Sequence, residues 1–181
     1  MNSITVSLNP TQIIGLTTYF FAMVSCGFAW ANVSGDARGN RLAAVLAVVE
    51  AALFLDQVFS GRWQLHDLLD REAIAWGVYS ERTDPQIAML CVLVASAGAG
   101  IALTIWRFRK RVGASLAVSG GVLSLSCWCV EVISLHAVDA VLYHAVNGVM
   151  LVTLVWILCA LMTAGGILWD TFSIRLQQVS N

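Results

Sequence analysis

Charged side chains are scarce in this sequence. Asp, Glu, Lys and Arg make up 12% of the 181 residues, against about 25% in a soluble globular domain. With only two prolines, the chain does not resemble a disordered or linker-rich protein. Ten basic and eleven acidic residues leave a formal charge of -1, which argues against a nucleic-acid-binding or polybasic surface. Apolar residues reach 59% and mean hydropathy is +0.78, so the composition predicts an integral membrane protein.

Long polar segments and catalytic motifs are also missing. The longest polar stretch between apolar runs is about 25 residues, too short to bury a core of its own, so a large catalytic domain is excluded. H-x-x-x-H, H-E-x-x-H, P-loop, G-x-S-x-G and dinucleotide-binding patterns do not occur. All five cysteines fall in apolar runs without a C-x-x-C pair, so thiol-disulfide chemistry is not expected. These absences leave enzyme activity open but favour a non-catalytic protein.

Five apolar runs approach the roughly 20 residues that cross a bilayer as a helix. They predict an all-α bundle of about five transmembrane helices in a single domain, residues 1–181. The expected helices cover residues 11–30, 42–59, 87–106, 112–135 and 146–168. A turn between Leu135 and Val146 is required because one helix from 112 to 169 would be far longer than a bilayer is thick.

The connection from Ser60 to Asp84 mixes tryptophan, leucine and tyrosine with charged residues. This mixture predicts a short helix lying in the headgroup plane over the bundle. A loop with a few buried anchors is the alternative.

Basic residues set the expected orientation, because they collect in cytoplasmic loops. If the N-terminus lies outside, seven basic residues lie on the inner side of the membrane and three on the outer side. The inner ones are Arg38, Arg41, Arg107, Arg109, Lys110, Arg111 and Arg175, and the outer ones are Arg62, Arg71 and Arg82. The N-terminus is therefore expected on the periplasmic side and the C-terminus in the cytoplasm.

Small residues recur in the third and fourth apolar runs, for example Gly98 in the third and Gly121 in the fourth. Small residues at helical spacing let two helix backbones approach closely. Both faces are expected to be packed, within the chain or against another subunit.

Two glutamates fall inside apolar runs, where a charge costs roughly 2.5 to 3.5 kcal/mol even on the most lenient scale. Glu50 lies near the middle of the second run, and Glu131 lies about one turn from the outer end of the fourth. Neither has a basic residue within two turns on its own helix. Each must be protonated, bonded to another helix or exposed to a wet cavity.

The other polar groups gather on the expected outer side. The candidate metal ligands are His66, His136, Asp139, His144 and Asp56. The candidate cofactor-binding residues are Glu50, Glu131, Tyr79 and Trp63. In one interpretation some of these converge on a metal, a haem edge, a quinone headgroup or a protonatable substrate. In the other they cap helix ends and contact interfacial water and lipid headgroups.

Several short stretches carry a resemblance. They are Glu50-Ala-Ala-Leu-Phe-Leu-Asp56, Trp63-Gln-Leu-His66, Arg71, Gly77-Val-Tyr79, Arg82, Gln86 and Glu131-Val-Ile-Ser-Leu-His136-Ala-Val-Asp139. Over roughly residues 50–139 the chain resembles a group of small polytopic bacterial membrane proteins. The resemblance implies a bacterial inner membrane and does not imply a reaction.

The sequence thus favours a multi-pass membrane protein that acts as a non-catalytic or accessory subunit and presents a polar periplasmic face to a partner or small ligand. One alternative is a redox-linked protein that binds a quinone, haem or metal through outer histidines and carboxylates. Another is a small proton-coupled transporter built around Glu50 and Glu131. Expected partners are the lipid bilayer and either another membrane subunit or a second copy, not nucleic acid.

Overall fold

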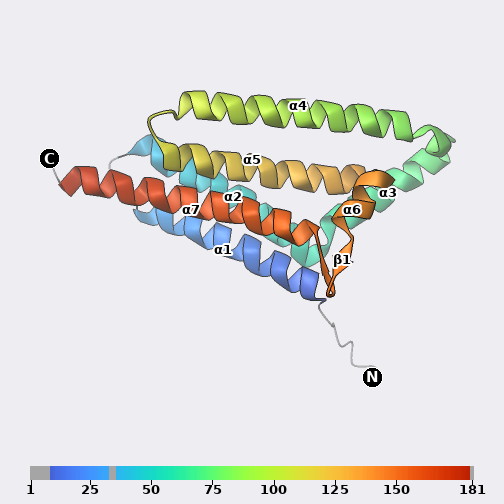
Figure 1. The fold of residues 1–181 in the computed structure, drawn as a ribbon, viewed down its shortest axis with the longest axis horizontal. Coiled ribbons are helices and arrows are strands. Elements are labelled where there is room, and N and C mark those ends of the chain that lie inside the picture. The colour runs from blue at the N-terminus through green and yellow to red at the C-terminus, as the bar shows by residue number, and fades with distance from the viewer. Residues whose placement is uncertain (1–8, 33–35, 180–181) are drawn as a thin grey trace, which may run out of the picture.

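Five long helices form the body of the protein in the computed structural model, which describes residues 9–32 and 36–179 (Figure 1). Each of the five is long and apolar enough to cross a membrane. They are α1 (Pro10–Asn32), α2 (Ala37–Phe59), α4 (Thr83–Arg107), α5 (Val112–Ile133) and α7 (Val152–Val179). The predicted all-α membrane bundle is therefore confirmed.

Shorter elements connect the helices at one end of the bundle. They are α3 (Gly61–Ala75), the 3-10 turn η1 (Tyr79–Glu81), α6 (His136–Leu142), β1 (Ala145–Val146) and β2 (Val149–Met150). The short helix expected between residues 60 and 84 is present as α3 (Figure 1). We call this the α3 end of the bundle. The opposite end holds the α4–α5 loop and the last residues of α7, and we call it the C-terminal end.

The last span begins later than expected. Residues 146–168 were predicted as a helix, but β1 and β2 pair as an antiparallel hairpin, and α7 begins only at Val152. Asn147 and Gly148 at the tip have φ values of 52° and 80°. Asn-Gly readily adopts such a left-handed turn, which explains why the apolar run is interrupted here.

Helices α1, α2, α5 and α7 pack together, whereas α4 lies along the outside of α5 (Figure 1). Two clusters fill the core. One, towards the α3 end, contains Tyr19, Leu53, Cys127, Val152 and Trp156. The other, towards the C-terminal end, contains Cys26, Ala29, Ala43, Leu46, Ala117 and Ile167.

Glycines permit the close contact of α5 with α7. A Cβ at Gly120 would lie 2.6 Å from the backbone nitrogen of Thr163, and one at Gly113 would lie 2.6 Å from that of Asp170. Gly121 is packed as expected, against Leu46. Gly98 is not packed within the chain, because no described atom outside its own helix lies within 4 Å of where its Cβ would be; packing against another subunit stays a prediction. That face of α4 turns away from the rest of the chain.

An arginine joins three helices at the C-terminal end. Arg111, just before α5, pairs with Asp36 at 2.7 Å and also with Asp170 of α7. The hydrogen bond to Asp170 and the two carboxylate charges raise the pKa of Arg111, although partial burial lowers it. Burial raises the pKa of Asp36, but hydrogen bonds from Gly39 and Arg38 and the charge of Arg111 outweigh it and hold that pKa below its usual range.

Candidate functional site

The end of α2 turns an arginine back into the bundle. Ser60 adopts a left-handed conformation with φ 55° and joins α2 directly to α3. Asp56 then accepts a hydrogen bond from the backbone nitrogen of Arg62 at 2.7 Å. Gly61 is required at this turn, because a Cβ there would lie 2.9 Å from the Asp56 carboxylate.

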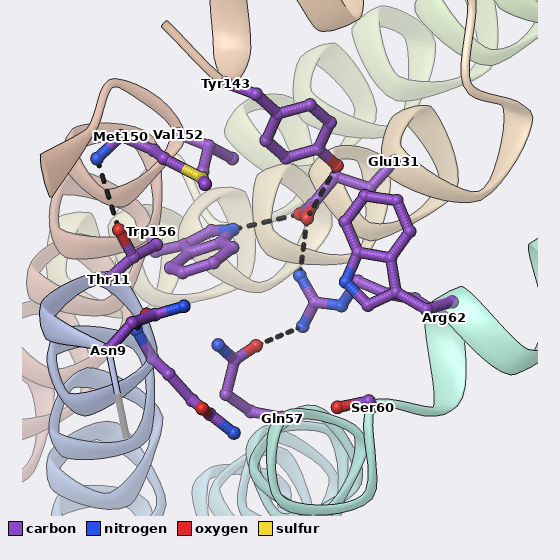
Figure 2. Close-up of a pocket in the computed structure, with 12 residues that line it drawn as sticks. Asn9, Thr11, Gln57, Ser60, Arg62, Glu131, Tyr143, Met150, Val152 and Trp156 are labelled. Carbon is purple, nitrogen blue, oxygen red and sulfur yellow. Dashed lines mark hydrogen bonds and ion pairs between the residues drawn. The ribbon is translucent and has the colours of Figure 1, made fainter. Parts of the chain in front are cut away.

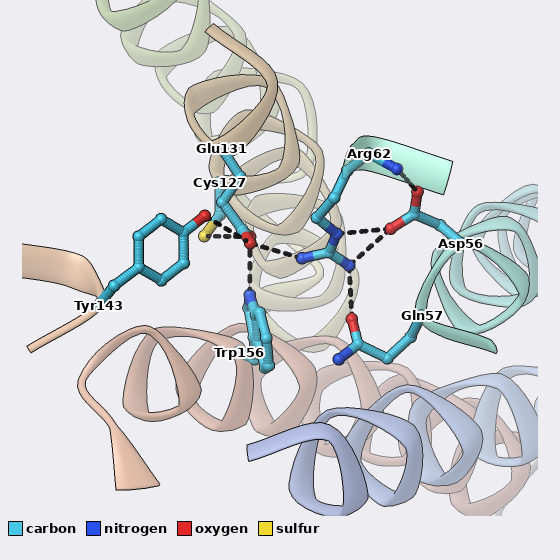
Figure 3. A network of polar contacts seen from close by, with 7 residues as sticks. All are labelled: Asp56, Gln57, Arg62, Cys127, Glu131, Tyr143 and Trp156. Atoms are coloured by element: carbon cyan, nitrogen blue, oxygen red, sulfur yellow. Dashed lines mark hydrogen bonds and ion pairs between the residues drawn. The ribbon is translucent and has the colours of Figure 1, made fainter. Parts of the chain in front are cut away.

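Arg62 is only 3% exposed and binds three acceptors (Figure 3). Its Nε donates to Asp56 at 2.7 Å, one terminal nitrogen to Glu131 of α5 at 2.6 Å and the other to Gln57 at 2.6 Å. The guanidinium therefore links α2, α3 and α5. Buried charges are found in proteins when they are paired and hydrogen-bonded in this way.

Glu131 is the centre of the same network (Figure 3). Besides Arg62, it accepts hydrogen bonds from Trp156 Nε1 of α7 at 3.0 Å and from the Tyr143 hydroxyl at 3.4 Å. The Cys127 thiol, one turn earlier on α5, lies 3.7 Å from its Oε1. The intramembrane glutamate thus finds partners on neighbouring elements, which is one of the three environments the sequence allowed for it.

Aromatic rings enclose the network. The Arg62 guanidinium lies over the Trp156 ring, 5.1 Å from its centroid, in cation–π contact. The rings of Trp63 and Tyr143 lie 5.4 Å apart. Aromatic side chains from α3, α7 and the segment after α6 therefore border the charged groups.

The carboxylates of Asp56 and Glu131 and the guanidinium of Arg62 together carry one negative charge in excess. Burial lowers the pKa of Arg62, but the charge and hydrogen bond of Glu131, followed by the charge of Asp56, outweigh burial and raise it, so Arg62 stays protonated. Burial, together with the negative charges of Glu131 and Asp139, raises the pKa of the Tyr143 hydroxyl, which therefore stays neutral.

A cavity of about 160 Å³ opens beside these groups (Figure 2). It lies between the start of α1, the α2–α3 junction and the start of α7. Thr11 of α1 forms one side of it, where its hydroxyl oxygen accepts a hydrogen bond from the backbone nitrogen of Met150 at 3.2 Å. The lining residues are Asn9, Thr11, Gln12, Gln57, Ser60, Arg62, Trp63, Glu131, Tyr143, Met150, Val152 and Trp156.

Of the four residues predicted to bind a cofactor, Glu131 and Trp63 line this cavity. Tyr79 does not; its ring lies under the Arg82 guanidinium, 3.9 Å from it, on the far side of α3. Glu50 lies deeper in the bundle and is not among the lining residues.

The five predicted metal ligands are dispersed. Asp56 binds Arg62, and His66 lies 3.3 Å from the carbonyl of Val132 and 3.6 Å from Asp70. His136 and His144 are exposed, and Asp139 accepts a hydrogen bond from Ser134. Within residues 9–32 and 36–179, no three His, Cys, Asp or Glu side chains come together as a metal site.

Sequence reasoning missed Arg62, Gln57, Tyr143 and Trp156 as site residues. From the sequence, Arg62 counts only as one of three basic residues on the outer side. One signal was present: Glu131 needed a partner from another element, and the expected outer side offered only three arginines.

Comparisons with known proteins add no relative. The chain matches no protein-family model, no curated protein and no solved structure. The function must therefore be argued from the site itself.

Proposed function

We propose that this multi-pass membrane protein binds a small organic cation in the Arg62–Glu131 cavity. The observation that carries the proposal is the buried network itself, which holds one more negative than positive charge. It borders an aromatic-walled cavity at the α3 end that Arg62 and Glu131 line, with Asp56 behind Arg62. Burying three charged groups is costly, and a well-packed apolar replacement is often as stable. A binding role explains why the charges are there.

The size of the cavity limits the ligand. An apolar cavity of about 150 Å³ holds one benzene molecule, so about 160 Å³ suits a molecule of similar size. Ligands with long chains or fused rings exceed this space. The proposed ligand therefore belongs among small metabolite-sized ammonium compounds.

Charge and aromatic rings favour a cation over an anion. The excess negative charge of the whole network disfavours carboxylates and phosphates, and Trp63 and Tyr143, which line the cavity, are rings that can attract positive charge. The hydroxyls of Thr11 and Ser60 also line the cavity and can bond a polar substituent of the ligand.

The proposed role is non-catalytic. Arg62, Glu131 and Tyr143 are engaged with one another rather than poised as a nucleophile and base. Positive-inside asymmetry supports a periplasmic location for the α3 end, and the resemblance to small bacterial membrane proteins supports the inner membrane. We infer an accessory subunit that presents a ligand-binding periplasmic face within a larger assembly.

Choline and its uncharged carbon isostere, 3,3-dimethylbutanol, test the proposal. Purified protein should be stabilised thermally by choline and not by the isostere, because only choline carries the positive charge. The Trp63→Leu variant should lose this stabilisation. Trp76→Leu should keep it, since Trp76 is 78% exposed and does not line the cavity. Equal stabilisation by both compounds, or by neither, would contradict the proposal.

A further inference from the structure

Glu50 lies in the middle of α2, apart from the site described above. Its side chain is completely buried, and neither carboxyl oxygen has a hydrogen-bond partner among the described residues. Nine residues, or about 13 Å, separate it from the end of α2 at Phe59. A glutamate side chain is too short to reach water across that distance.

The groups around Glu50 come from three other helices. Thr163 of α7 lies beside the carboxyl. The titratable groups facing it are Tyr19 and Cys26 of α1 and Cys159 of α7, which are neutral phenol and thiol groups. On α5, the buried Ser124 hydroxyl also lacks a partner. No ion pair joins Glu50 to a basic residue in the described part of the chain.

The hydrogen bond of Thr163 indicates the protonation state of Glu50. The Thr163 hydroxyl donates its hydrogen to the Cys159 carbonyl at 3.1 Å. A hydroxyl has one hydrogen to donate, so while Thr163 bonds the Cys159 carbonyl the Glu50 carboxyl has no hydroxyl donor from it. An ionised carboxylate has no hydrogen to offer and would remain unpaired in the membrane interior, whereas a protonated carboxyl supplies the missing donor.

We propose that Glu50, with Thr163 beside it, forms a proton-binding site in the centre of the bundle, which exchanges its proton with the α3 end. The site binds a single proton on the Glu50 carboxyl. It is separate from the cation cavity and does not depend on a ligand there.

Polar groups lead from Glu50 towards the α3 end. Ser124 and Cys127 are buried on one face of α5, one turn apart, and Cys127 contacts Glu131. Tyr19 lies within electrostatic range of both Glu50 and Glu131. Towards the C-terminal end the core cluster is rich in alanine, and the buried Thr171 hydroxyl there bonds the Ile167 carbonyl of its own helix. The proposed route of proton exchange therefore leads to the α3 end.

Infrared spectroscopy of the purified protein tests the protonation state. At neutral pH the wild type should show the carbonyl stretching band of a protonated carboxylic acid. The band should be lost in Glu50→Gln and kept in Glu131→Gln. An unchanged band in a folded Glu50→Gln variant would overturn the proposal.

Carbodiimide labelling of the wild type tests the same claim if Glu50→Gln does not fold. Dicyclohexylcarbodiimide enters membranes and reacts with protonated carboxyls, so peptide mapping should find it on Glu50, with faster labelling at acidic pH. Absence of Glu50 among the labelled residues would contradict a protonated carboxyl. Protection by sodium ions at constant pH would contradict a proton site in favour of a sodium site.

The direction of exchange is tested by transfer into deuterated buffer. The shift of the Glu50 band should be slowed in Tyr19→Phe, which removes a hydroxyl on the α3 side. It should be unchanged in Cys26→Ala, which removes a thiol on the opposite side. Equal rates in all three proteins, or slowing only in Cys26→Ala, would contradict entry from the α3 end.

Discussion

The two ends of the bundle each place one arginine between two carboxylates from other parts of the chain. At the α3 end Arg62 binds Asp56 and Glu131, and at the C-terminal end Arg111 binds Asp36 and Asp170. The side chain of Arg62 is 3% exposed and that of Arg111 is 28% exposed. Arg62 also borders an aromatic cavity, whereas Arg111 borders a hollow lined chiefly by other basic residues.

The difference in burial changes how much each arginine cluster contributes to stability. A partly exposed ion pair such as Arg111–Asp36 contributes about 1 kcal/mol or less. Of the Arg111 cluster only Asp170 is buried, so Arg111 joins the helix ends at a smaller desolvation cost than Arg62. Buried ions lose several kcal/mol of hydration each, which their mutual attraction roughly offsets. The Arg62 network is therefore poorly explained by stability and better explained by binding.

Removing each arginine should give the largest contrast. Arg62→Ala leaves two buried carboxylates without their cation and should destabilise the protein by about 3–5 kcal/mol. Arg111→Ala should cost less, because only one of its two carboxylates, Asp170, is buried and Asp36 is reached by water. Unfolding in detergent, followed by circular dichroism, measures both; similar losses in the two variants would remove the distinction between the ends.

A second variant tests what holds the C-terminal end together. Gly113→Ala places a Cβ 2.6 Å from the Asp170 backbone nitrogen and should cost about 1–3 kcal/mol, as overpacking does. Gly98→Ala, on the open face of α4, is the control and should not destabilise. The same unfolding experiment measures both glycine variants. A Gly113→Ala variant as stable as the wild type would show that the ion pair dominates this end.

The smallest effect concerns pH at the C-terminal end. The pKa of Asp36 is lowered in the folded protein, so its contribution is complete above the ordinary aspartate pKa of about 3.9 and is lost as pH falls through the lower folded value. Asp36→Asn keeps an N-cap for α2 but loses the charge, at a cost of about 1 kcal/mol or less. Melting curves of the two proteins should converge in acid. A gap that widens below pH 4 would reverse the assigned sign.

The spans were predictable from the sequence because the bilayer requires about 20 apolar residues in each. The hairpin was not predictable from hydropathy, because Val146 to Leu168 forms one apolar run. Only the Asn147-Gly148 pair indicates a turn there. For Glu131 the need for a partner was predictable, but the partner was not. Arg62 reaches Glu131 across 69 positions in the sequence, through a turn at Ser60 that hydropathy does not encode.

The most direct test of the account removes every charge from the Arg62 network at once, in the triple variant Asp56→Asn, Arg62→Met, Glu131→Gln. If the charges are retained for binding, this variant should unfold within about 1 kcal/mol of the wild type, because uncharged replacements of a buried ion cluster are often neutral. It should also lose all stabilisation by choline. A triple variant as unstable as Arg62→Ala, or one still stabilised by choline, would contradict the account.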